Sequence, residues 1–282
     1  MSGLVDTALD GGPYAVAVGP DGAAWVTLVH AGEIARVTRD GAVTRFPVAG
    51  GSKPSLITVG PDGALWFTRS GDDRIGRIDA DGRCTAYALP DGSAPFGIAA
   101  GPDDGVWFTA MGWGIGRLDA DGTLTDRVPV SGLPSMITAG PDGALWFTLH
   151  DANAIGRLTL FGDLTLRELP TPQAGPVGIA ATHDDAVWFT EIRAGQLGRI
   201  PLGDAIQELP LPGRPHAVVA DPSGGVWVSL WAADQLARVS ADGEVSTVDL
   251  PAGSEPHGMA IDGDGGLWVA LEAGHVVRLP TG

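Results

Sequence analysis

Cysteine and basic residues are scarce in this 282-residue chain, and both shortages narrow what it can be. A single cysteine, Cys84, excludes a disulfide within the chain, so the fold does not depend on oxidation. Lysine and arginine number 17 against 34 acidic residues, which gives a net charge of −17. Nucleic acids and anionic membranes attract basic patches, so neither is expected as a partner. An acidic surface is instead compatible with binding a divalent cation.

Long apolar runs and the common catalytic motifs are also missing. No stretch of 18 apolar residues could cross a membrane, and residues 1–3 lead into the rest of the chain without an apolar signal region. We therefore expect a cytoplasmic protein. The chain has no P-loop, no dinucleotide fingerprint, no HExxH and no serine in a GxSxG turn. These absences argue against the usual nucleotide, zinc-protease and serine-hydrolase chemistries.

What the chain does contain is abundant glycine and proline, 43 and 22 residues, and a sevenfold repeat. Seven tryptophans recur 39 to 42 residues apart, and a proline stands twelve residues before each. The pairs are Pro13 and Trp25, Pro54 and Trp66, Pro95 and Trp107, Pro134 and Trp146, Pro176 and Trp188, Pro215 and Trp227, and Pro256 and Trp268. This period predicts an all-β fold, a seven-bladed β-propeller with four-stranded antiparallel blades. We expect residues 1–282 to form one domain, because all-β domains often reach this length.

Residues 94–130 illustrate how one copy of the repeat becomes a blade. The segments FGIAA, VWFTA, GIGRL and LTDRVPV are predicted strands, and the intervening GPDDG and DADG segments are typical of tight turns. The repeated tryptophan is expected to pack between adjacent blades, because an aromatic residue at a fixed repeat position is core material.

The two ends of the chain predict how the ring closes. The last copy stops after three strands, and the segment GLVDTALDG before the first proline resembles the fourth strands of other copies. An N-terminal strand that completed the last blade would remove two unpaired strand edges. We therefore predict that residues 3–9 pair with residues 275–280.

Two positions of every copy should meet at one rim of the ring, because the second strand of a blade runs antiparallel to the first. They are the residue after the proline and the fourth residue after the tryptophan, and we call these fourteen positions the mouth. They are Tyr14, Ser55, Phe96, Ser135, Val177, His216 and His257, and Val29, Ser70, Met111, His150, Ile192, Trp231 and Glu272. Most are small or apolar, and the polar exceptions gather in the last two copies.

The last copy also has Glu255 directly before its proline, so two carboxylates, Glu255 and Glu272, lie near the imidazole of His257. Such a set predicts a hard-cation site beside a base. Mg²⁺ suits it, since Mg²⁺ takes few protein carboxylates and keeps waters that a substrate oxygen can replace. His216 and Trp231 in the sixth copy, and Tyr14 across the closure, are expected as neighbours.

Other reactive side chains are not expected in this site. His150 belongs to the mouth of the fourth copy and could face the site only across the channel. Glu191, three residues after its tryptophan, points to the opposite strand face from the mouth positions. The remaining candidates fall in turns, outer connections or an outer strand, namely His30, His183, His275 and Cys84.

The recurring GPDGALWFT…IGRL copy, with RPHAV at 214–218, EPHGM at 255–259 and LWVALE at 267–272, resembles the virginiamycin B lyase (streptogramin B lyase) family. The resemblance covers nearly the whole chain. It implies a seven-bladed propeller that linearises type B streptogramins by Mg²⁺-dependent elimination. These antibiotics are cyclic hexadepsipeptides closed by an ester from a threonine side-chain oxygen. By motif, the resemblance implies a general base at His257, Mg²⁺ ligands at Glu255 and Glu272, and substrate contacts at His216 and Trp231.

Two alternative functions compete with a lyase. A metal-dependent lactonase propeller would draw ligands from several blades, whereas the mouth offers Ser55, Ser135 and Val177 there. A non-catalytic binding propeller would not need two carboxylates beside an imidazole. A mouth with Trp231 and Tyr14 suits a large cyclic peptide with aromatic groups. No association surface is evident, so we expect a monomer.

Overall fold

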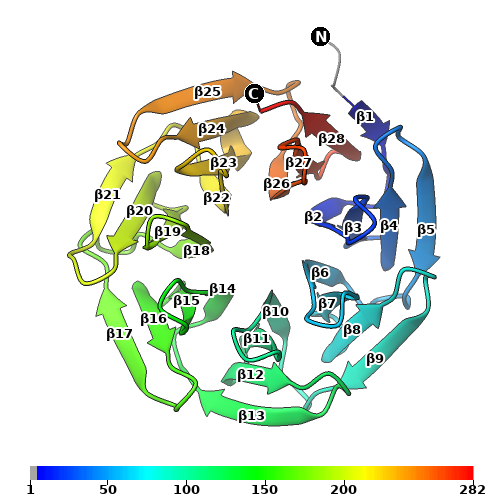
Figure 1. Ribbon diagram of the computed structural model, residues 1–282, viewed down its shortest axis with the longest axis horizontal. Helices are drawn as coiled ribbons and strands as arrows, with labels where there is room; N and C mark the ends of the chain where they lie inside the picture. Colours follow the sequence, from blue (N-terminus) through cyan, green and yellow to red (C-terminus); the bar gives the residue numbers. More distant parts are fainter. Residues whose placement is uncertain (1–4, 282) are drawn as a thin grey trace.

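Seven four-stranded sheets surround a common centre in the computed structural model, which describes residues 5–281 (Figure 1). In six of the sheets the chain runs from the innermost strand outward, and hydrogen-bonded neighbours are antiparallel. Blade one contains β2 (Pro13–Val18), β3 (Ala24–Leu28), β4 (Glu33–Val37) and β5 (Val43–Pro47). Blade two contains β6 (Pro54–Val59), β7 (Leu65–Arg69), β8 (Arg74–Ile78) and β9 (Cys84–Ala88). Blade three contains β10 (Pro95–Ala100), β11 (Val106–Ala110), β12 (Gly114–Leu118) and β13 (Leu124–Pro129).

The remaining blades repeat this order. Blade four contains β14 (Pro134–Ala139), β15 (Leu145–Leu149), β16 (Ala154–Leu158) and β17 (Leu164–Glu168). Blade five contains β18 (Pro176–Thr182), β19 (Ala186–Glu191), β20 (Gln196–Pro201) and β21 (Gln207–Pro210). Blade six contains β22 (Pro215–Ala220), β23 (Val226–Leu230), the short 3₁₀ turn η1 (Trp231–Ala233), β24 (Gln235–Val239) and β25 (Val245–Asp249). Within residues 5–281, no helix is long and apolar enough to cross a membrane.

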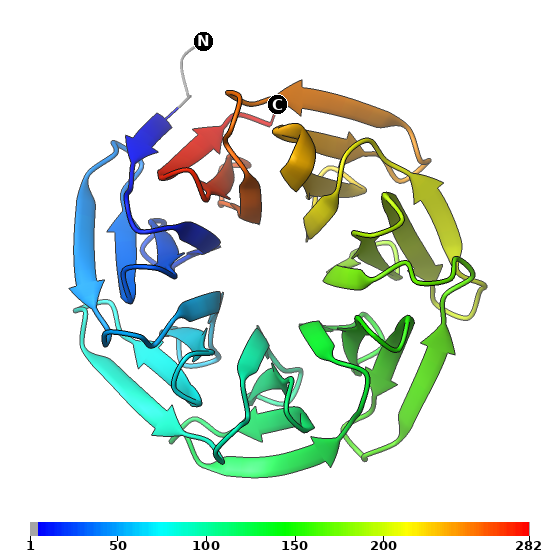
Figure 2. The same cartoon turned by 180° about the vertical axis from the view of Figure 1, so that it is seen from behind.

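Blade seven is assembled from both ends of the chain. It contains β26 (Pro256–Ile261), β27 (Leu267–Leu271), β28 (His275–Leu279) and, as its outer strand, β1 (Val5–Ala8). β1 runs antiparallel to β28, with Val5 opposite Arg278 and Ala8 opposite His275. Both views of the ring show the two ends meeting at this seam (Figures 1 and 2). The predicted seven-bladed ring and its closure are therefore confirmed, and residues 3 and 4 of the predicted pairing lie outside the described residues.

The repeated tryptophan and a repeated arginine share one aspartate in most blades. In blade two, Asp62 accepts hydrogen bonds from Trp66 Nε1 at 2.9 Å and from Arg77 Nε at 2.7 Å. The indole packs against Ile98 and Phe108 of the next blade. A buried indole N–H needs an acceptor, which explains the recurring Asp beside the Trp, although Trp188 and Trp227 have no such partner in the described part of the chain. The predicted position of the tryptophan between blades is confirmed.

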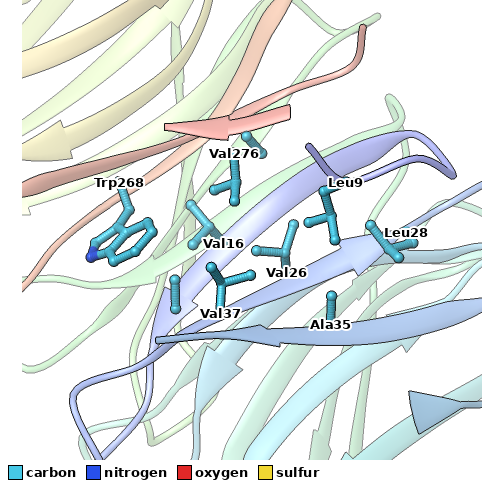
Figure 3. Close-up of a cluster of buried hydrophobic side chains, with 10 residues drawn as sticks. Leu9, Val16, Val26, Leu28, Ala35, Val37, Trp268 and Val276 are labelled. Atoms are coloured by element: carbon cyan, nitrogen blue, oxygen red, sulfur yellow. The ribbon is translucent and has the colours of Figure 1, made fainter. Parts of the chain in front are cut away.

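The closing seam is packed like the other blade interfaces. Trp268 and Val276 of blade seven contact Val16 and Val26 of blade one, in a cluster that also contains Leu9 from the segment after β1 (Figure 3). All five side chains are buried. Burial of this apolar surface holds blades one and seven together, and residues from both sides of the seam can therefore form one site.

Candidate active site

Four ring side chains from four different blades converge at the mouth. The ring centres of Tyr14 and His257 lie 4.6 Å apart, as do those of His216 and His257, and Phe96 lies 6.5 Å from Tyr14. The rings therefore lie across the central channel. Directly below them the inner strands enclose a cavity of about 140 Å³ lined by apolar side chains. Trp231 adjoins this group, with its ring 6.3 Å from that of His257.

His257 is held by a carboxylate of its own blade. Nε2 of His257 lies 2.6 Å from Oε2 of Glu272, which belongs to the turn after β27. The other carboxylate oxygen, Oε1, lies 3.4 Å from Nε2 of His30 in blade one. The His257 side chain is 8% exposed and that of Glu272 is 28% exposed. Glu272 thus connects a buried imidazole to the molecular surface across the seam between blades seven and one.

Glu255 reaches the same place through the backbone. Its carbonyl oxygen accepts a hydrogen bond from the Glu272 amide at 3.1 Å. Its negative charge favours protonated His257. The structure therefore brings together five of the predicted site residues, Tyr14, His216, Trp231, His257 and Glu272, and joins Glu255 to them through its backbone. Their individual roles remain predictions.

Burial controls the protonation of the two histidines. It lowers the pKa of His216 to about 3, and nearby His257 adds to the effect. Burial also lowers the pKa of His257, although the hydrogen bond and charge of Glu272 act in the opposite direction. Burial, followed by the charge of Glu272, raises the pKa of Tyr14 to about 12. At neutral pH both imidazoles are therefore uncharged, which is the form that can accept a proton.

Three buried nitrogen atoms around the site find no hydrogen-bond partner among residues 5–281. They are Nδ1 of His216, Nδ1 of His257 and Nε1 of Trp231. Buried polar atoms are nearly always paired, so unpaired ones at a single place are unusual. His216 is otherwise well fixed, because its carbonyl oxygen accepts a 2.8 Å hydrogen bond from Thr190 of the preceding blade. The site is therefore rigid in its backbone and has unused hydrogen-bonding capacity in its side chains.

His30 is the residue that sequence reasoning missed. It does lie in a turn, as expected, but this turn reaches Glu272 across the seam. The available signal was Gly12, which occupies in blade one the position of Glu255 in blade seven. A Cβ atom at Gly12 would lie 2.3 Å from Cδ2 of His30, so a larger residue there would displace the imidazole from this position.

The other excluded residues lie elsewhere. His150 contacts the carbonyl oxygen of Pro176 at 3.4 Å, between blades four and five. His275 pairs with Asp6 on the outer side of blade seven, and Cys84 is exposed in an outer strand. Glu191 is fully buried and is considered below.

The donor set fits Mg²⁺ better than a metal that needs a complete protein cage. Among residues 5–281, no three or more His, Cys, Asp or Glu side chains form a group that could hold a metal ion. Zinc and calcium sites ordinarily need such groups. Mg²⁺ is commonly held by one or two carboxylates and keeps several waters. Glu255 and Glu272, joined through their backbones and open to solvent, match that requirement.

Comparison with known proteins agrees with this geometry. The sequence model of the virginiamycin B lyase family matches residues 4–279. The chain is 71% identical over 216 residues to the virginiamycin B lyase of Mycobacterium sp. (strain KMS), covering 76% of this chain and 77% of that protein. It is 69% identical over 221 residues to that of Mycolicibacterium smegmatis, covering 78% of each.

Solved structures agree as well. Virginiamycin B lyase from Staphylococcus aureus superposes with a TM-score of 0.92 at 38% identity, covering 98% of each chain. A catalytically inactive form of that enzyme, solved with quinupristin, gives 0.92 at 37% identity and the same coverage. With its seven blades, its clustered site residues and these similarities, the chain belongs to the virginiamycin B lyase family.

Proposed function

We propose that this protein inactivates type B streptogramins by opening their ester-closed ring through elimination. The observation that carries the proposal is the buried His257 imidazole, which lies 2.6 Å from the Glu272 carboxylate, while the Glu272 amide is hydrogen-bonded to Glu255. Relatives of high identity are virginiamycin B lyases, and an inactive relative was solved with quinupristin. All the groups invoked come from one chain, so a monomer is sufficient.

His257 would accept the proton from the threonyl Cα of the substrate. Nε2 faces the partly exposed carboxylate of Glu272 and would be the reacting atom, whereas Nδ1 is buried. In the neutral ring Nε2 donates its hydrogen to Oε2 of Glu272. Substrate binding must therefore displace Oε2 from Nε2, and the ring hydrogen must move to Nδ1, before Nε2 can accept the substrate proton. As the Cα–H bond breaks, its electrons form the Cα–Cβ double bond, and the Cβ–O bond electrons leave with the carboxylate. A positioned base of this kind contributes roughly 10²–10⁴ in rate.

Glu255 and Glu272 would hold Mg²⁺ beside the base. When bound there, Mg²⁺ polarises a carbonyl oxygen next to the carbon that loses its proton. His216 and Trp231 would contact the substrate. Their Nδ1 and Nε1 atoms have no protein partner among residues 5–281, but they are buried and could bind substrate only if its entry exposes them. Trp231 and Tyr14 offer ring faces on which aromatic groups of a cyclic peptide can pack.

The mass of the product tests the proposal directly. The protein is incubated with quinupristin and Mg²⁺, and the products are analysed by chromatography and mass spectrometry. Elimination gives a linear product with the mass of the ring, whereas ester hydrolysis, as by a lactonase, adds one water. An intact ring after long incubation would refute the proposed activity, and a product heavier by one water would refute elimination. A parallel incubation with EDTA, expected to stop turnover, tests the metal requirement.

A further inference from the structure

The backbone conformation of Glu255 needs an explanation, because it is unfavourable for glutamate. Its φ of 50° lies in the left-handed region, which costs a non-glycine residue roughly 1–2 kcal/mol. Two other blades have glycine at this position, Gly12 and Gly175, and three have Lys53, Ala94 and Leu133 in the same left-handed region. The repeat therefore imposes this backbone shape, and contacts from outside Glu255 decide how firmly it is held.

Asp234 of blade six makes the contacts that hold it. Asp234 follows η1, and its Oδ1 accepts a hydrogen bond from the Glu255 amide at 2.9 Å. Its Oδ2 accepts one from the Gly253 amide at 2.7 Å. Its own carbonyl oxygen accepts one from the Leu250 amide at 2.9 Å. One residue thus fixes both ends of the connection, residues 250–255, that leads into blade seven.

The restraint continues into the site. The carbonyl oxygen of Glu255 accepts the Glu272 amide hydrogen bond, so both carboxylates follow from the position of one peptide segment. Trp231 belongs to η1, the same short turn that ends at Asp234. A shift of Asp234 would therefore move Glu255 and an aromatic neighbour of His257 together.

The same device occurs in blade two, where it has no chemical consequence. Asp73 Oδ1 accepts the Ala94 amide at 2.7 Å, and Oδ2 accepts the Gly92 amide at 2.8 Å. Its carbonyl oxygen accepts the Leu89 amide at 2.9 Å, as in blade six. Asp73 and Asp234 both have a φ of 52°. Oδ1 of Asp73 thus binds the amide of an alanine, whereas Oδ1 of Asp234 binds the amide of Glu255.

We propose that Asp234 is a positioning residue that holds the Glu255 carboxylate where it can bind Mg²⁺ with Glu272. The inference rests on the proposed function, because it takes these two carboxylates as the metal ligands. Residues that orient metal ligands without touching the ion typically contribute 10–100-fold to metal affinity. Asp234 is expected to act in that range, although it belongs to a different blade from both ligands.

The test compares Asp234→Ala with Asp73→Ala, which removes the same two side-chain acceptors from a connection that carries no proposed metal ligand. Mg²⁺ binding to each purified protein, without substrate, is measured by isothermal titration calorimetry, and unfolding by thermal melts. Both variants should lose similar stability. Asp234→Ala should bind Mg²⁺ at least about tenfold more weakly than wild type, and Asp73→Ala should bind it within about twofold. Asp234→Asn, which keeps one acceptor oxygen and opposes the Gly253 amide with an NH₂ group, should fall between them.

Equal Mg²⁺ affinity in Asp234→Ala and Asp73→Ala, with normal binding by wild type, would overturn the positioning role and leave the proposed function intact. A wild-type protein that binds no Mg²⁺ would overturn the metal assignment and the positioning role together. That result is visible before any variant is made. A wild-type protein that binds Mg²⁺ but does not open quinupristin would instead count against the proposed activity alone.

Discussion

Blades two and seven have the same backbone at the mouth and different side chains on it. The residues that correspond are Lys53 and Glu255 before the proline, Ser55 and His257 after it, and Ser70 and Glu272 at the end of the second strand. Both residues before the proline are left-handed, with φ of 47° and 50°. In both blades the other two side chains are in contact, through hydroxyls 3.1 Å apart in blade two and through imidazole and carboxylate 2.6 Å apart in blade seven.

This comparison separates what the propeller supplies from what the site requires. In these two blades the repeat brings the two mouth positions within hydrogen-bonding distance, although the residues differ. A pair of hydroxyls has no group that accepts a proton at neutral pH, whereas an uncharged imidazole beside a carboxylate can do so. Three substitutions on a fixed backbone therefore account for the proposed chemistry, in line with the general independence of fold and function. Each position can be tested against its inert counterpart.

The largest effect is expected from the residue after the proline. His257→Ala removes the proposed base and should lower quinupristin opening by about 10²–10⁴-fold. The matched Ser55→Ala should leave the rate unchanged, since the Ser55 hydroxyl contacts only Lys53 and Ser70 of its own blade among the described residues. Rates are measured by loss of the cyclic peptide, and folding is checked by thermal melts. Activity of His257→Ala within tenfold of wild type would exclude this imidazole as the base.

The residue before the proline should show a smaller loss of function together with a gain in stability. Glu255→Gly removes one proposed Mg²⁺ ligand, so affinity for Mg²⁺ should fall by more than about tenfold, since residues around the ligands alone contribute that much. Glycine also relieves the left-handed backbone, and the free energy of unfolding should rise by up to about 1 kcal/mol. Lys53→Gly should give the gain in stability without the loss of Mg²⁺ binding. A clear loss of stability in either variant would contradict the strain argument.

The ring, its closure and the six site residues could be predicted because each depends on periodicity. A constant offset of twelve residues between proline and tryptophan fixes which residues share the rim, so a deviation from the repeat at that rim can be recognised without coordinates. The closing strand was predictable for the same reason. The last copy of the repeat lacks a fourth strand, and a spare strand precedes the first copy.

Contacts that do not follow the period could not be predicted. His30 is five residues after its tryptophan, and it reaches Glu272 only because Gly12 leaves space and the seam brings blade one beside blade seven. Asp234 acts on the next blade through main-chain amides, and such amides are the same in every residue type. Sequence patterns report side-chain chemistry along one strand, and these contacts join different blades through backbone geometry.

A third comparison concerns the position three residues after the tryptophan. Blade seven has Leu271 there, and blade five has Glu191. Blade two has Arg69, which forms an ion pair with Asp72. Both carboxyl oxygens of Glu191 are buried without a hydrogen-bond partner in the described part of the chain. Burial, with a smaller contribution from Glu208, raises the pKa of Glu191 to about 8. Glu191→Leu should raise the free energy of unfolding by about 1–3 kcal/mol, the usual cost of an unsatisfied buried polar group.

The effect of Glu191 should depend on pH in a defined direction. Between the ordinary glutamate pKa and about 8, the native protein retains a proton that the unfolded chain has released. Stability of the wild type should therefore fall as pH rises through this window, by up to about 1.4 kcal/mol per pH unit from this group. Denaturant unfolding at pH 5 and pH 8 measures the difference. Glu191→Leu and Glu191→Gln should both remove this decline in stability with pH. Only the leucine variant should also gain apolar burial. An unchanged decline in both variants would refute Glu191 as its cause.

The smallest effect is expected across the seam, where blade one adds His30 to the pair in blade seven. The His30 side chain is 67% exposed and its contact with Glu272 is 3.4 Å long, and exposed pairs of this kind contribute at most about 1 kcal/mol. His30→Ala should therefore lower quinupristin opening by no more than about fivefold, whereas His183→Ala, in a turn of blade five, should not change it. A loss above a hundredfold in His30→Ala would mean that this imidazole takes part in the reaction, and blade one would then have to be counted with blade seven as a source of catalytic groups.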